Sequence, residues 1–285
     1  MKAHMDSHKS RMKLTFVKPC IELTPYIQSI WIFESPIGLP AADINMAAPN
    51  GCSKLIFSYE NPIISTVEGR AVKSKEHNLY FVGNRDISVQ VCTAEGKTGF
   101  IGIEFYPHGA YQLFGIPMYE TANRLLSADE LIPHWGNDTN EQLNNIIDSI
   151  EKVNFIQKKL ETLLRKNQLQ NPYIEYCVNM LKASYGLISI AELEKKTGYS
   201  RRYLEMLFKK HVGFSPKVLA GIFRFQKFYK KWAAGQSFEE FKEELYNYYY
   251  DQSHFVKEFK RMTGFSPLWF SQKVTNEFGK KLSAR

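Results

Sequence analysis

Two passages near the end of the chain carry cations at matching positions. They run from Leu204 to Pro216 and from Phe255 to Pro267, and equivalent residues such as Gly213 and Gly264 lie 51 positions apart. Each ends an apolar helical stretch with two Lys or Arg residues and continues to a Gly-Phe-Ser-Pro motif. A fixed spacing predicts a duplicated unit. Lys and Arg bind phosphates, so the indicated chemistry is contact with a polyanion.

Short helices are predicted to position these cations. The glycine of each motif can end one helix, and the Ser-Pro pair can cap and start the next. A shorter helix precedes each copy, because Ser189 with Glu192 and Ser237 with Glu240 have the spacing of a capping box. A short helix, a tight turn and a second basic helix form the helix-turn-helix pattern, whose second helix enters the DNA major groove. Residues 217–232 are predicted to form a connecting helix.

The positive charge of the chain is concentrated in the same region. The net charge is +8, and residues 170–285 contain 20 Lys and Arg against 11 Asp and Glu. This distribution is typical of a nucleic-acid-binding part joined to a neutral one. A solvated basic surface would have the same charge, so the charge alone leaves both interpretations open.

The first part of the chain is predicted to be rich in β-strands. Short apolar runs separated by turn residues suggest a sandwich or barrel, and a helical stretch is expected after Pro107. The apolar spacing from Asn140 to Lys166 predicts one long amphipathic helix, with Thr139 and Gln142 as its capping box. The polar stretch Asn167–Pro172 marks a boundary.

From Pro172 to Phe270 the chain resembles the AraC/XylS family of transcriptional regulators. The passage from Tyr250 to Pro267 is similar to the signature of that family's second helix-turn-helix unit. Weaker likenesses at residues 49–57, 81–84 and 102–111 resemble the sensory half of one subgroup. The resemblance implies a cupin-like N-terminal β-barrel, a dimerisation helix and a seven-helix DNA-binding domain.

The expected fold class is therefore α+β with several domains. The expected domains are a cupin-like barrel for sensing or assembly (1–138), a linker or dimerisation helix (139–169) and a DNA-binding domain with tandem helix-turn-helix units (170–285). The expected function is a sequence-specific, cytoplasmic transcriptional regulator that is not an enzyme. Its expected partners are double-stranded DNA, a small-molecule effector and a second copy of the chain.

By position, the resemblance assigns DNA-contacting residues to both second helices. Base contacts are expected from Ser200, Arg201, Arg202, Glu205 and Met206 in the first helix, and from Gln252, Ser253, His254 and Lys257 in the second. Phosphate contacts are expected from Lys209, Lys210, Lys260 and Arg261. Two alternatives remain open: Arg202 as a plain surface charge, and His254 as a cap of the turn.

The sequence departs from the family pattern at four positions. Met206 replaces an Arg, and Glu194 and Glu244 replace small residues in the first helix of each unit. Tyr248 stands where the second turn normally has Gly, which is costly if the backbone needs a positive φ. The tyrosines around it, at 246–250, either pack around an altered turn or stack on nucleic acid.

Other side chains are assigned to the N-terminal half. Five could line a ligand pocket, with ordinary barrel core or surface as the alternative: Trp31, Tyr59, Glu104, Tyr106 and Tyr111. No catalytic residue, metal site or cofactor is expected, because the histidines are isolated and the nucleophile and phosphate-loop motifs are missing.

The cellular context follows from the cysteines and the first residues. The four cysteines form no CxxC pair, which favours reduced thiols. Residues 1–13 are polar and basic, so no secretory signal is expected. No apolar run is long enough to span a bilayer, so no membrane partner is expected. Two other function classes stay open. One is a cupin-type enzyme or small-molecule binder with a basic helical appendage, and the other is a nonspecific nucleic-acid adaptor.

Overall fold

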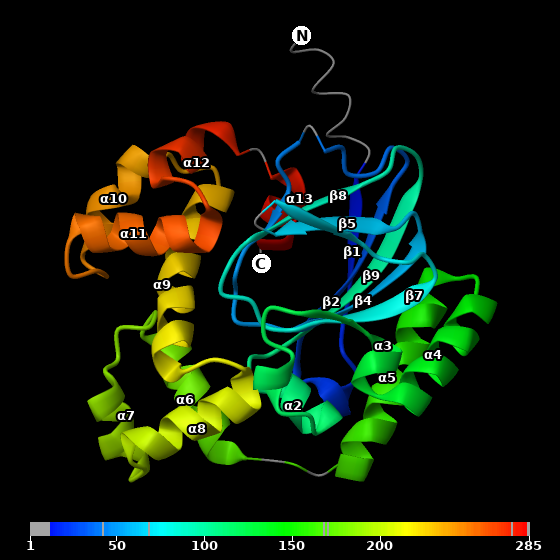
Figure 1. Ribbon diagram of the computed structural model, residues 1–285, viewed down its shortest axis with the longest axis horizontal. Coiled ribbons are helices and arrows are strands. Elements are labelled where there is room, and N and C mark those ends of the chain that lie inside the picture. The colour runs from blue at the N-terminus through cyan, green and yellow to red at the C-terminus, as the bar shows by residue number, and fades with distance from the viewer. Residues whose placement is uncertain are drawn as a thin grey trace.

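The computed structural model describes residues 12–283, except 42, 68, 168, 170 and 275. The predicted lack of a secretory signal rests mainly on residues 1–11, which lie outside the described residues, as do the expected domain ends at 1, 170 and 285. The chain has an α+β fold: residues 12–167 (the N-terminal half) hold the sheets, and residues 171–283 (the C-terminal half) are helical (Figure 1). The predicted division into a β-rich and a helical part is confirmed.

The strands form two antiparallel sheets. The six-stranded sheet has the order β1 (Lys13–Val17), β2 (Ile27–Ser35), β9 (Thr98–Phe105), β4 (Lys54–Glu60), β7 (Asn78–Val82) and β10 (Leu125–Ser127). The four-stranded sheet has the order β3 (Met46–Ala47), β8 (Val89–Thr93), β5 (Ile63–Val67) and β6 (Arg70–Lys73). Within the described residues these pairings leave edge strands on both sheets, so no closed barrel is found.

One face of the six-stranded sheet is covered by helices. Apolar side chains of β2, β4, β7 and β9 alternate toward a core that also takes in α2 (Gly109–Phe114), the helix expected after Pro107. Short helices η1 (Ile21–Leu23), η2 (Met118–Glu120) and α3 (Ala128–Leu131) border the same core.

The prediction of a single helix from Asn140 to Lys166 is wrong. The structure has α4 (Pro133–Asn145) and α5 (Ser149–Asn167), with a break between them. Asp148 causes the break, because its carboxylate accepts hydrogen bonds from the backbone N–H of Ile150 and Glu151, each at 2.9 Å, and so starts a new helix.

The capping residues and the apolar seam of that predicted helix also differ from expectation. Thr139 lies inside α4 and donates to the Trp135 carbonyl instead of capping. Ile147 is 97% exposed, whereas Val153 and Leu160 are buried against the chain's own sheet. The seam predicted to pair with a second chain or to pack on the chain's own barrel, Ile146, Ile150, Val153, Leu160 and Leu164, is therefore divided, because Ile150 is exposed whereas Val153 and Leu160 are buried.

The C-terminal half is a series of helices. In chain order they are α6 (Pro172–Ala183), α7 (Ile190–Thr197), α8 (Arg201–Val212), α9 (Pro216–Ala233), α10 (Phe238–Tyr246), α11 (Gln252–Thr263), α12 (Pro267–Lys273) and α13 (Glu277–Ser283). One apolar cluster joins α6, α7 and α8 to the start of α9, and a second joins the rest of α9 to α10, α11 and α12. Helix α9 therefore bridges two packed helix pairs, α7–α8 and α10–α11.

Helix α13 returns to the N-terminal half. Phe278 packs edge-on against Trp31 and Phe33 of the six-stranded sheet, with ring centroids 5.9 and 5.1 Å apart. None of the described helices is long and apolar enough to cross a membrane.

Candidate nucleic-acid interface and cavities

Capping residues set both ends of helix α8. The Ser200 hydroxyl accepts a hydrogen bond from the Tyr203 N–H, and Gly213 has a φ of +93° that ends the helix. Glu194, which departs from the family pattern, adds a second cap, because its carboxylate accepts from the Arg201 N–H at 2.6 Å. These caps fix the direction in which the first turn of α8 points.

The predicted DNA-contacting residues of α8 share its outer face. Ser200, Arg201, Arg202, Met206, Lys209 and Lys210 are exposed, and Glu205 is half-buried. Arg201 and Glu205 form an ion pair one turn apart, at 3.3 Å. Arg202 makes no such pair within the described residues, so its guanidinium is available for an incoming acceptor.

Helix α11 has the same plan with a different cap. Asp251 accepts from the His254 N–H at 2.7 Å, and Gly264 ends the helix with a φ of +81°. The predicted contact residues are all exposed: Gln252, Ser253, His254, Lys257, Lys260 and Arg261. The structure therefore brings these six side chains to one outer face, as it does for α8.

The turn between α10 and α11 tolerates Tyr248 because it is longer than its counterpart. Five residues separate α10 from α11, whereas three separate α7 from α8. Tyr248 is not among the described residues with positive φ, so the expected strain is absent. The Tyr248 hydroxyl accepts a hydrogen bond from the Lys227 ammonium, which also forms an ion pair with Glu244 at 2.9 Å.

The neighbouring tyrosines divide between packing and exposure. Tyr246 and Tyr249 pack edge-on against Phe255, with centroids 5.8 and 5.0 Å away. Tyr250 is 94% exposed. Packing around the altered turn is thus confirmed for Tyr246 and Tyr249.

The C-terminal ends of both helices are attached to the N-terminal half. Asn84 donates to the Val212 carbonyl at 2.6 Å and so satisfies a carbonyl that the end of α8 leaves without a helical partner. The Arg261 guanidinium lies 2.8 Å from the Asp86 carboxylate, and the Ser88 N–H donates to the Met262 carbonyl at 2.6 Å. One loop between β7 and β8 therefore contacts both helix pairs.

The N-terminal half also faces the outer surface of α8. Pro117 and Tyr119, beside and within η2, line an open hollow of about 580 Å³ together with Arg202, Glu205, Met206, Lys209 and Lys210. The Lys210 ammonium lies 5.5 Å from the centre of the Tyr111 ring. A duplex bound to the outer face of α8 would therefore also contact Pro117 and Tyr119.

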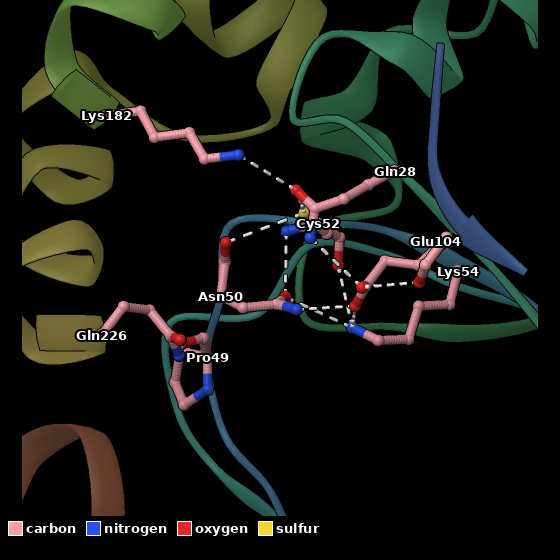
Figure 2. Close-up of polar contacts among 9 residues, drawn as sticks. Gln28, Pro49, Asn50, Cys52, Lys54, Glu104, Lys182 and Gln226 are labelled. Carbon is pink, nitrogen blue, oxygen red and sulfur yellow. Dashed lines mark hydrogen bonds and ion pairs between the residues drawn. The ribbon is translucent and has the colours of Figure 1, made fainter. Parts of the chain in front are cut away.

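A buried polar network lies where the two halves meet (Figure 2). Glu104 accepts from Asn50 at 2.6 Å and from Ser29 at 3.2 Å, and it pairs with Lys54 at 3.1 Å. Burial acts to raise the pKa of Glu104, but the charge of Lys54 and the hydrogen bonds outweigh it, so the pKa is lowered. Glu104 is therefore ionised at neutral pH.

Side chains of the C-terminal half reach this network. Lys182 of α6 donates to the Gln28 side-chain carbonyl at 3.4 Å, and Gln226 of α9 donates to the Pro49 carbonyl at 2.5 Å (Figure 2). A hollow of about 300 Å³ opens beside them, and Lys227 and Lys230 also line it.

The five predicted ligand-pocket residues do not gather at one place. Glu104 lines the hollow between the halves, whereas Trp31 packs in the aromatic cluster with α13. Tyr59 donates to Glu34 at 3.4 Å, Tyr106 stacks with His108 and Tyr111 contacts His211. Ligand binding by these five residues stays a prediction.

A separate cavity of about 100 Å³ lies between the two sheets. Its walls are mostly apolar side chains from β4, β5, β7 and β8, such as Ile56, Ile63, Val82 and Val89. Arg85 lines it as well, and burial lowers the pKa of that guanidinium. Nothing in the sequence pattern identifies this residue, because a single arginine after a strand has no distinctive spacing.

One cluster of potential metal ligands occurs among the described residues. The donor atoms of Cys20, Glu22 and Glu161 lie within 4.8 Å of one another. Burial, helped by the hydrogen bond and charge of Glu161, raises the pKa of the Cys20 thiol to about 11. The thiol is therefore protonated at neutral pH, which opposes metal binding there.

The chain is similar to known proteins in one segment of its sequence and in its fold. A family model described as a domain of unknown function (DUF6597) matches residues 15–127, and no curated protein matches the chain. Among solved structures, ToxT from Vibrio cholerae is similar over 93% of this chain and 99% of that chain, with 10% identity and a TM-score of 0.48.

Two further solved structures are similar at comparable identity. An unsaturated-fatty-acid-bound ToxT from Vibrio cholerae covers 91% of this chain and 98% of that chain, with 10% identity and a TM-score of 0.44. The EutQ protein of Clostridium difficile covers 33% of this chain and 68% of that chain, with 11% identity and a TM-score of 0.24. At these values, function has to be argued from this chain's own residues.

Proposed function

We propose that this protein is a sequence-specific DNA-binding transcriptional regulator and not an enzyme. The observation that carries the proposal is that α8 and α11 present equivalent, exposed outer faces near opposite ends of α9 (Figure 1). Each face combines hydrogen-bonding side chains in the first two turns with cations in the last turn. Two such helices on one connecting helix support the tandem helix-turn-helix arrangement that the AraC/XylS resemblance implies.

The length of α9 supports binding to one face of a duplex. The helix has 18 residues, which corresponds to about 27 Å at a rise of ~1.5 Å per residue. Helices that enter successive major grooves must be about 34 Å apart. A connector of this length is of the same order as that separation.

The exposed side chains suit both parts of DNA recognition. Arg202 and Gln252 have the donor geometry to read base edges, and Glu205 can accept from cytosine. Lys209 and Lys260, about two turns further along each helix than Arg202 and Gln252, are placed to meet phosphates, which orient the protein without reading sequence. Met206 offers only apolar contact, and Arg201 is paired with Glu205, so Arg202 is the arginine of the first helix best placed to donate to a base edge.

The division into domains, the dimer and the cellular compartment are part of the same proposal. We assign residues 1–138 to a cupin-like sensory domain for a small-molecule effector, 139–169 to a linker or dimerisation segment and 170–285 to the DNA-binding domain. The exposed Ile147 and Ile150 at the junction of α4 and α5 support a homodimer contact. Four free cysteines support a reducing, cytoplasmic compartment.

Selection of bound sequences from random duplex DNA tests this function. The full-length protein is incubated with the pool at physiological salt, and bound DNA is sequenced over successive rounds. A sequence-specific regulator enriches one motif that survives excess competitor DNA. A nonspecific adaptor retains DNA without enrichment, and an enzyme with a basic appendage shows neither.

A further inference from the structure

Helix η2 of the N-terminal half lies beside the outer face of α8. Pro117 and Tyr119 line the same open hollow of about 580 Å³ as Arg202 and Met206. The Tyr119 side chain is 55% exposed, so its phenol is open to solvent. A side chain of the N-terminal half therefore shares one surface with side chains that are expected to read bases.

Close packing fixes the position of η2 relative to α8. A Cβ atom at Gly213, which ends α8, would lie only 2.9 Å from the Met118 carbonyl oxygen, so a larger residue would force the two segments apart. The Asn84 side chain donates to the Val212 carbonyl at 2.6 Å, and the Asn84 carbonyl accepts from the Asn123 N–H at 2.8 Å. The end of α8 and the segment that follows η2 are therefore attached to the same residue.

The walls of the hollow match the two chemical parts of a sugar–phosphate strand. Pro117, Tyr119 and Met206 offer apolar surface, which suits the carbon atoms of deoxyribose. Lys209 and Lys210 offer ammonium groups, which suit phosphate oxygens. One strand of a duplex presents both parts next to each other along its length.

The charge around the hollow is positive. Three cations line it: Arg202, Lys209 and Lys210. Within the described part of the chain one carboxylate lines it, and that residue, Glu205, is paired with Arg201 at 3.3 Å. The exposed Glu120 follows Tyr119 in the chain but does not line the hollow. This balance favours an anionic strand as the occupant.

We propose that Tyr119 contacts the sugar–phosphate strand that borders the major groove occupied by α8, so that the N-terminal half forms part of the DNA interface. The phenol ring packs on a deoxyribose, and the hydroxyl donates a hydrogen bond to a phosphate oxygen. The inference rests on the proposed regulator function, because it requires a duplex on α8. It adds a contact from outside both helix-turn-helix units.

A contact of this kind strengthens binding without reading sequence. Contacts to phosphate and sugar position a protein on the duplex and carry no sequence information directly. A phenol is also neutral, so its contact leaves the salt dependence of binding unchanged, which follows the number of phosphates neutralised by cations. These two properties distinguish Tyr119 from Arg202, which is expected to read a base, and from Lys209, which is expected to neutralise a phosphate.

Fluorescence anisotropy with the full-length protein measures the contact. The probes are two labelled duplexes of equal length, one with the sequence that the selection enriches and one with an unrelated sequence. Tyr119→Phe should weaken binding to both by about two- to tenfold, the usual net effect of losing one hydrogen bond. Tyr119→Ala should weaken both further, because the ring is lost as well.

Matched variants separate this contact from other effects. Both changes at Tyr119 should leave the logarithmic salt slope at its wild-type value, whereas Lys209→Ala should lower the slope by about 1. Tyr176→Ala removes an exposed tyrosine of α6 that lies outside the hollow and should bind both duplexes like wild type.

Photo-crosslinking locates the contact without relying on affinity. The photoreactive residue p-benzoylphenylalanine in place of Tyr119 should attach to bound DNA under ultraviolet light. The same residue in place of Ile147 should not, because that position is 97% exposed at the α4–α5 junction, away from α8 (Figure 1).

The same measurements reveal a Tyr119 that does not touch the strand. Wild-type affinity in both Tyr119 variants, or no crosslink from position 119, overturns the inference. Tighter binding by Tyr119→Ala also overturns it and shows that η2 obstructs the duplex. A loss confined to the enriched sequence would assign Tyr119 to a base instead. Wild type that binds neither duplex rejects the regulator function itself, whereas normal wild-type binding beside any of the other results leaves that function standing.

Discussion

The carboxylate of Asp86 lies 2.8 Å from the guanidinium of Arg261, across 175 positions of the chain. Arg261 is one of the residues expected to meet a DNA phosphate, so in this arrangement a protein carboxylate occupies the place of the phosphate. A phosphate at the last turn of α11 would therefore compete with Asp86 for this guanidinium.

Changing Asp86→Asn should strengthen binding to every duplex. The change frees Arg261 for one more phosphate, and each added phosphate contact steepens the logarithmic salt dependence by about 0.9. Fluorescence anisotropy at several salt concentrations measures both effects. Asp138→Asn makes the same charge change on α4, where the carboxylate pairs with Lys159. An equal gain in both variants would show that net charge, and not release of Arg261, is responsible.

Arg202 and Lys260 should differ in what they contribute to DNA binding. Arg202→Ala should cost about 1–3 kcal/mol on the selected site and little on unrelated duplexes, because a base contact is sequence-specific. Lys260→Ala should weaken all duplexes alike and lower the salt slope by about 1. If Arg202→Ala left the affinity for every sequence unchanged, Arg202 would be a plain surface charge.

Glu104→Gln should destabilise the protein by about 3 kcal/mol, because it leaves the Lys54 ammonium buried without its counter-ion. The two side chains are only 13% and 18% exposed. Chemical unfolding measures the change. Adding Lys54→Met should recover much of the loss, whereas Glu239→Gln, which breaks an exposed pair, should cost less than about 1 kcal/mol. No recovery in the double variant would assign the loss to the other hydrogen bonds of Glu104.

Stability should fall as the pH drops below about 6.5. Burial, with smaller effects of the neighbouring Lys210 and His108, lowers the pKa of His211 from 6.5 to about 4. Between these values the unfolded chain takes up a proton that the folded chain excludes, so stability is complete above the higher pKa and is lost toward the lower one. The loss is at most about 1.4 kcal/mol per pH unit for one histidine.

The pH effect can be assigned with two variants. His211→Gln should flatten the dependence of the denaturant midpoint on pH between 7.5 and 5, and His134→Gln, at an exposed position, should not. His108 shows the same pKa of about 4 from burial, with a small effect of Lys182, so part of the slope should survive in His211→Gln. An unchanged slope in that variant would rule out His211 as a contributor.

Sequence reasoning succeeded where the signal is local. The C-terminal end of α8 and the start of α9 follow from Gly213 and the Ser215-Pro216 pair, because caps depend on a few neighbouring residues. The contact residues of α8 and α11 were carried over by position from the AraC/XylS resemblance, and the structure finds them on exposed faces. The prediction of one long helix was wrong because the apolar spacing continues through residues 146–150 without a break. A single side chain, Asp148, starts a new helix there.

Contacts between residues far apart in the chain could not be predicted from a single sequence. Asn84 and Val212 are 128 positions apart, and nothing in the spacing of either residue identifies the other. In the sequence Arg85 is an ordinary loop arginine, and only the fold places it at the cavity between the two sheets. The predicted contact faces were therefore accessible from the sequence, whereas the attachment of both helices to the β7–β8 loop was not.

The most direct test is the DNA selection carried out in parallel with wild type, Arg202→Ala and Gln252→Ala. The account predicts that wild type enriches a motif with two elements about one helical turn apart, and that each variant loses a different one of the two elements. Retention of DNA without any enriched motif, with binding that fades steeply as salt rises, would contradict the account and leave only electrostatic attraction.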